Sequence, residues 1–178
     1  MRTFGRILLA GLSLLTLTGS DPKPPREIKL LIPEKTFKTE GPNKVLRVSF
    51  DDLNLLQVLN MDPVTADAPE HMPEWLKNLD GKRIRIGGYM YPPFETKRLK
   101  QFAYAVDEAV CTFGRQPEVY DIFRVDMKKG VTAEFEGLKP IDVEGVFHIE
   151  VVQLEGELVQ LYYIDDAVIV PKKSGAKK

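Results

Sequence analysis

The alternation of apolar and polar residues is most regular over residues 82–90. Ile84 and Ile86 alternate with Arg83 and Arg85, and this two-residue period predicts a half-buried strand. Two adjacent glycines, Gly87–Gly88, follow in the same segment, and paired glycines inside a strand are typical of a bulge or a sharp bend. Because a bent strand can belong to two sheets, this segment predicts the closure of a small barrel.

Other segments with a similar pattern predict the remaining strands. They cover Val45–Ser49, Phe102–Val106, Ile122–Met127, Ile141–Ile149, Leu158–Tyr163 and Ala167–Val170. Gly145 predicts a second bend, a capping box at Ser49 and Asp52 predicts a first short helix, and Pro73 opens a second. The pattern therefore predicts a mainly β fold: a small closed or partly open antiparallel barrel, OB-fold-like, with two short helices.

The first 20 residues have the pattern of an export signal. Basic residues precede an apolar stretch, Ile7–Leu17, that is too short to span a membrane comfortably, and Thr18–Ser20 supplies small residues for cleavage. Ser20 stands where a lipoprotein carries its lipidated cysteine. We therefore expect cleavage near Ser20, no lipid or transmembrane anchor in the mature chain, and a periplasmic or cell-envelope location. A buried N-terminal helix is the alternative.

Composition divides the remaining chain into three parts. Residues 21–44 are rich in proline and charge and predict a linker. Residues 45–171 hold the predicted β-barrel domain, and residues 172–178 form a basic tail. The formal net charge of −1 gives no overall attraction to nucleic acid or to an acidic membrane.

Catalytic motifs are missing from the sequence. One cysteine excludes a disulfide framework within the chain and a cysteine-based zinc site, and two histidines are too few for a His-rich metal site. There is no P-loop, nucleophile elbow or dinucleotide fingerprint. We therefore predict no catalytic residue, no metal and no cofactor, and favour a non-enzymatic binding or accessory module. A hydrolase or redox enzyme with an unrecognised site is the alternative.

The best candidate for a binding site is the basic and aromatic segment from Lys82 to Tyr104. Its six cations are opposed by a single acid, Glu95, and basic and aromatic residues together on a barrel face suit nucleic acid, sugar or an acidic partner. Export argues against nucleic acid, so the predicted partner is an unknown envelope protein or an acidic ligand. The predicted contact residues are Arg83, Arg85, Tyr89, Tyr91, Phe94 and Arg98. The alternative is an ordinary solvated face over core aromatic residues.

A possible second binding loop contains Cys111, Phe113 and Arg115. A thiol beside an arginine can be reactive, but a lone cysteine is more often a small buried apolar side chain. A redox relay would also need a resolving cysteine, which the chain lacks. His148 lies out of phase with the apolar residues of its strand, which predicts an exposed polar face.

Several motifs in a fixed order carry a family resemblance. They are Leu79-Asp-Gly-Lys-x-Ile-x-Ile-x-Gly-Tyr-Met-x-Pro, Phe102, Cys111-x-Phe-Gly-x-x-Pro, Val143-x-Gly-x-Phe and Tyr162. Over roughly Val45 to Val170 the chain resembles an uncharacterised family of exported bacterial proteins known as domain of unknown function three-two-nine-nine. The resemblance implies a periplasmic or envelope location and a barrel-like β domain. It implies no established activity, so no catalytic residue follows from it.

We expect the mature protein to begin at Asp21 without lipidation, because small residues end the apolar stretch and no lipobox cysteine is present. The intact mass of the exported protein measures this directly. A retained Met1 or an added acyl mass would contradict the expectation.

Overall fold

The computed structural model of the chain describes residues 26–112 and 117–170, without the side chains of Cys111 and Thr112. The predicted signal peptide (residues 1–20), the basic tail (residues 172–178), Phe113 and Arg115 lie outside the described residues. The elements in chain order are β1 (Thr39–Glu40), β2 (Val45–Val48), α1 (Phe50–Leu53), α2 (Leu55–Leu59), α3 (Ala68–His71), α4 (Glu74–Lys77), β3 (Arg83–Met90), β4 (Gln101–Ala105), α5 (Glu108–Thr112), β5 (Ile122–Met127), β6 (Pro140–Leu154) and β7 (Glu157–Val170).

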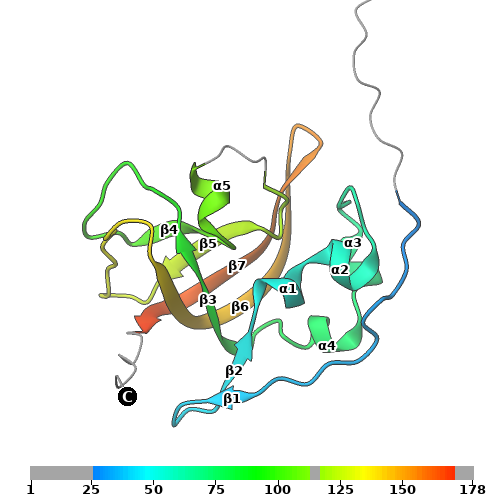
Figure 1. The fold of residues 1–178 in the computed structure, drawn as a ribbon, viewed down its shortest axis with the longest axis horizontal. Helices are drawn as coiled ribbons and strands as arrows, with labels where there is room; N and C mark the ends of the chain where they lie inside the picture. Colours follow the sequence, from blue (N-terminus) through cyan, green and yellow to red (C-terminus); the bar gives the residue numbers. More distant parts are fainter. Residues whose placement is uncertain (1–25, 113–116, 171–178) are drawn as a thin grey trace, which may run out of the picture.

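The strands form one mixed sheet in the order β1-β2-β3-β4-β5-β7-β6, and a further pairing between β3 and β6 closes five of them into a ring (Figure 1). The mainly β class is confirmed. The expectation of purely antiparallel pairing is wrong, because β2 pairs with β3, and β5 with β7, in parallel. The described residues also hold five short helices rather than two. The first predicted helix is divided at Asn54 into α1 and α2, and α3 and α5 occupy segments where no helix was predicted.

Strand β3 has two different neighbours along one edge and a single neighbour along the other. Its first half pairs with β2 and its last two residues pair with β4, while β6 runs beside nearly its whole length. Ile84 and Ile86 point into the ring and are fully buried, as their alternation predicts. The change of neighbour falls at Gly87–Gly88, so this strand does serve both parts of the sheet.

The predicted bulge at Gly87–Gly88 is wrong. Both glycines keep an unbroken register with β6, and neither has a positive φ. Space is what requires glycine here: a Cβ on Gly88 would lie 2.6 Å from the carbonyl oxygen of Ala105 and 2.7 Å from the ring of Phe50. The second bend was predicted at Gly145 of β6, and the register of β6 with β7 does shift beside this residue. The extra residue is on β7, where Asp166 has a φ of 45°.

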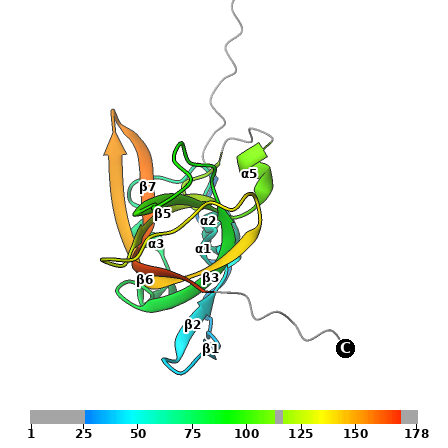
Figure 2. The ribbon, with the colours of Figure 1, turned by 90° about the vertical axis from the view of Figure 1, so that its left-hand side faces the viewer.

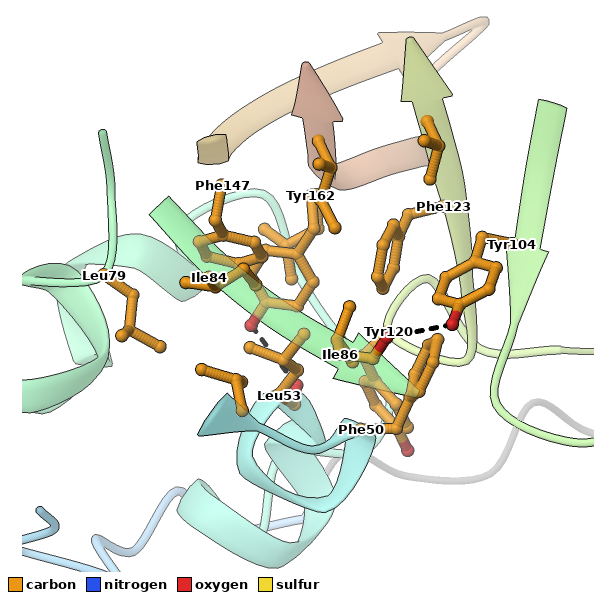
Figure 3. Packing of buried hydrophobic residues seen from close by; sticks show 14 of the residues in the cluster. Phe50, Leu53, Leu79, Ile84, Ile86, Tyr104, Tyr120, Phe123, Phe147 and Tyr162 are labelled. Carbon is orange, nitrogen blue, oxygen red and sulfur yellow. Dashed lines mark hydrogen bonds between the residues drawn. The ribbon is translucent and has the colours of Figure 1, made fainter. Parts of the chain in front are cut away.

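Aromatic side chains fill the inside of the ring (Figure 3). Phe50 of α1 stacks on Phe123 of β5 with 5.1 Å between ring centroids. Tyr162 is fully buried and its hydroxyl donates a hydrogen bond to the carbonyl oxygen of Leu53, 3.3 Å away. Burial raises the pKa of this phenol, so it remains a neutral donor. Because side chains fill the interior of the ring, residues that could bind a partner lie on its outer surface.

The described part of the proline-rich segment runs along the helices (Figure 1). The backbone amides of Lys29 and Leu31 donate to the carbonyl oxygens of Leu59 and Val58, at 2.8 Å each. The indole of Trp75 donates a hydrogen bond to the carbonyl oxygen of Ile32, 2.8 Å away. This segment, interpreted from its composition as a linker, is therefore hydrogen bonded to the domain from its first described residues onward.

We expect Gly88→Ala to lower the free energy of unfolding by about 1–3 kcal/mol, because the added methyl meets backbone and ring atoms that cannot move freely. Gly87→Ala is the matched control. Its methyl would meet only the ends of the Asp142 and Arg47 side chains, at 3.0 and 3.1 Å, which can shift. Urea unfolding of both variants measures the difference, and equal midpoints would contradict this account of Gly88.

Candidate functional site

The strand part of the predicted site is an ion-pair network on the outer face of β2, β3 and β6. The two-residue period turns Arg83 and Arg85 outward from the buried isoleucines. Arg85 Nη2 lies 2.8 Å from Glu144 Oε2, and Arg83 Nε lies 3.1 Å from Glu144 Oε1. Arg83 Nη1 also reaches Asp166 Oδ2 at 2.8 Å, which ties β3 to the bulge in β7. Neighbouring pairs extend the network to Glu40, Arg47 and Asp142.

Glu144 is the centre of this network. Its residue is buried, and burial alone would raise its pKa, but hydrogen bonds from Arg85 and Arg83 outweigh that effect and the net pKa is lowered. Replacing either arginine by glutamate would place a second carboxylate against this buried one. Arg83 and Arg85 therefore contribute to the stability of the fold, and their charge is matched by acids of the same chain.

The loop part of the predicted site lies between β3 and β4 and is open to solvent. Phe94 is fully exposed and Tyr91 is 39% exposed. The loop is held by backbone hydrogen bonds: the Tyr91 amide donates to the Ala103 carbonyl at 2.9 Å, and the Phe135 amide donates to the Thr96 carbonyl at 2.8 Å. The side chains of Tyr91 and Phe94 are thus exposed to solvent, while the backbone on either side of Phe94 is hydrogen bonded to neighbouring segments.

A second loop, between β5 and β6, adds residues that the sequence reasoning missed. Leu99 and Ala133 exchange two backbone hydrogen bonds of 2.9 Å, which brings this loop beside the first. The second loop contributes Lys128, Lys129 and Val131, all exposed. We use the name loop surface for eight exposed aromatic, apolar and basic residues of the two loops: Tyr91, Phe94, Lys97, Arg98, Lys100, Lys128, Lys129 and Val131.

The predicted site residues therefore fall into separate places. Tyr91, Phe94 and Arg98 come together on the loop surface, and Arg98 has a left-handed φ of 55°. Tyr89 is half-buried near the end of β3, opposite Ala105 of β4. Cys111 belongs to helix α5 rather than to the loop we expected there.

A row of polar side chains crosses the outer face of β6, β7 and β5. His148 stacks on Tyr163 with 4.6 Å between ring centroids, and the guanidinium carbon of Arg124 also lies over the Tyr163 ring, 4.9 Å from its centroid. His148 Nε2 is 3.2 Å from Asp165 Oδ1.

In the described residues no group of three or more His, Cys, Asp or Glu side chains is arranged to hold a metal ion. A groove of about 350 Å³ runs beside this row, lined in part by Gln101, Arg124 and Val159.

Comparisons with known proteins show a structural similarity but no match in sequence. No family model matches the sequence, and no curated protein matches it. The crystal structure of a DUF3299 family protein from Pseudomonas aeruginosa PAO1, at 2.45 Å resolution, is similar with a TM-score of 0.49 and 16% sequence identity, covering 74% of this chain and 99% of that one. DUF3299 is also the family that the sequence motifs of this chain resemble. Among the described residues, no helix is long and apolar enough to cross a membrane.

We expect Glu144→Gln to lower the free energy of unfolding at pH 7 by about 1–3 kcal/mol, because it removes the charge that two arginines share. The folded pKa of Glu144 is lowered. Its contribution is therefore present above the unfolded pKa of about 4.3 and is lost as the pH falls through the folded value.

Urea unfolding of the wild type and of Glu144→Gln between pH 7 and pH 3 measures this. The difference in the free energy of unfolding between the wild type and Glu144→Gln should become smaller below about pH 4.3. Glu157→Gln, at an exposed position of the β6–β7 hairpin, is the control for losing one carboxylate. A gap that stays constant over the whole pH range would contradict the central role of Glu144.

Proposed function

We propose that the protein is an exported, non-enzymatic binding or accessory module of the periplasm or cell envelope, which contacts an acidic ligand or protein partner through the loop surface. One observation carries the proposal: Phe94 is fully exposed on a loop whose backbone is held at Tyr91 and Thr96. A large aromatic side chain in water has no benefit for folding, whereas at an interface it supplies much of the contact energy.

The charges around Phe94 support an acidic partner. In the part of the chain that the structure describes, Lys97, Arg98 and Lys100 take part in no ion pair, whereas Arg83 and Arg85 are matched by acids. Unmatched cations on a surface steer acidic partners and raise the rate of association. Two prolines precede Phe94, and their fixed φ lowers the entropy lost when the loop is immobilised.

The arrangement of the ring supports an OB-fold-like barrel as part of this proposal. The ring closes through five strands in the order β3, β4, β5, β7, β6, with the last two exchanged relative to chain order, as in a five-stranded Greek-key barrel. OB-folds bind ligands on the second and third strands and on the loop between the first and second. The corresponding parts here are β4, β5 and residues 91–100, beside the groove that contains Arg124.

The combined variant Phe94→Ala, Lys97→Glu, Arg98→Glu should lose capture of an acidic partner from envelope extracts, because it removes the aromatic contact and reverses two charges. The fold should remain intact, since all three side chains are exposed. An affinity pull-down followed by mass spectrometry measures capture, and circular dichroism checks the fold.

A matched control carries the same kinds of change elsewhere: Leu30→Ala, Lys38→Glu, Lys44→Glu, at three other exposed positions. This control should capture the partner as the wild type does, and capture by both should weaken as salt rises and screens the charges. Equal recovery of the partner by the loop variant and the wild type would contradict the proposal.

A further inference from the structure

We propose that the loop surface docks the protein onto an anionic phospholipid bilayer. The inference rests on the proposed function, because it names the acidic partner of the same two loops. Three features support it: exposed apolar side chains on both loops, unmatched cations near them, and acids on the β6–β7 hairpin, which projects away from the loops.

The two loops lie at one end of the ring, where β7 also ends (left in Figure 1, toward the viewer in Figure 2). Phe94 is fully exposed, Tyr91 is 39% exposed, and Val131 of the second loop is 37% exposed. Because the Thr96 carbonyl and the Tyr91 amide hold the first loop, its aromatic tip can enter a bilayer without a rearrangement of the backbone. Apolar side chains flanked by basic residues are typical of surfaces that lie in the headgroup boundary of a membrane.

The cations are placed around these tips. Residues 91–100 and 128–139 hold six cations and three acids. Lys139 pairs with Glu136, and the other five cations form no ion pair among the described residues. Lys100, Lys128 and Lys129 border a hollow of about 260 Å³, into which a phosphate group can fit as a partner for lysine. Basic residues clustered in this way are attracted to anionic lipid when they lie within about one Debye length of the membrane surface.

The acids are concentrated elsewhere. From residue 140 to residue 170, which covers β6 and β7, the chain has seven acidic residues and no lysine or arginine. Asp142, Glu144 and Asp166 pair with arginines of β2 and β3, whereas Glu150, Glu155 and Glu157 lie on the β6–β7 hairpin without such partners among the described residues. The tip of the β6–β7 hairpin projects away from the loop surface (upper right in Figure 1). An anionic bilayer would repel this hairpin and attract the loops, so the charge distribution orients the protein with its loops toward the membrane.

The first test is co-sedimentation of the exported, processed protein with vesicles of phosphatidylglycerol and phosphatidylethanolamine, compared with vesicles of phosphatidylcholine. We expect binding to the anionic vesicles at least tenfold tighter than to the neutral ones, and weaker binding at high salt. Phe94→Ala and the double variant Lys128→Glu, Lys129→Glu should each reduce binding at least fivefold. The control is the double variant Lys38→Glu, Lys44→Glu, which reverses two lysine charges at exposed positions outside the two loops. It should bind the vesicles as the wild type does.

The second test asks whether the tip of the first loop enters the bilayer. The natural Trp75 is buried and its indole is hydrogen bonded, so its emission should not change. Phe94→Trp adds an exposed fluorophore whose emission should shift to shorter wavelength with anionic vesicles, and Leu30→Trp should show no shift. An unshifted emission from Phe94→Trp at a lipid concentration that sediments the protein would overturn the inference.

The failure of this inference can be told apart from the failure of the proposed function. Loop-dependent capture of an acidic soluble protein, with no binding to anionic vesicles, would overturn the membrane docking and leave the proposed function standing. Equal behaviour of the wild type and the loop variants toward both vesicles and extracts would overturn both.

Discussion

The pairing of β3 with β6 is the constraint on which the rest of the structure depends. It closes the ring, and it leaves the other edge of β3 to be shared between β2 and β4. The Tyr104 hydroxyl lies within hydrogen-bond distance of the carbonyl oxygens of Ile86 and Ile141, at 3.1 and 2.8 Å, so one buried phenol contacts both strands of the closing pair. Burial raises the pKa of this phenol, which keeps it a neutral hydrogen-bond donor at physiological pH.

The local features of the fold could be predicted from the sequence, because alternation and capping act over a few residues. The inward direction of Ile84 and Ile86, the capping box at Ser49 and the aromatic character of the first loop all follow from such short patterns. The prediction of a bulge at the glycines of β3 was wrong, and the lack of space for a side chain is clear only at Gly88. Positive φ and lack of space both select glycine, and a sequence does not distinguish between these two causes.

The ion pairs of the β3 arginines could not be predicted from the sequence, because they join residues far apart in the chain. Arg83 and its partner Asp166 are separated by 83 positions, and Arg85 meets Glu144 from 59 positions away. The predicted basic face therefore divides into two parts. Arg85 lies in register with Glu144 of β6, and Arg83 reaches Glu144 and Asp166. By contrast, Lys97, Arg98 and Lys100 of the first loop form no ion pair among the described residues.

The loops are held in place by main-chain hydrogen bonds, as between Leu99 and Ala133, and this has a consequence for sequence variation. Bonds of this kind form whatever side chain each residue carries, except proline at a donor position. Exchanges at the tips of the loops should therefore leave the position of the loops unchanged. The same scaffold could then acquire a different surface by ordinary point substitution, with little cost to the stability of the ring.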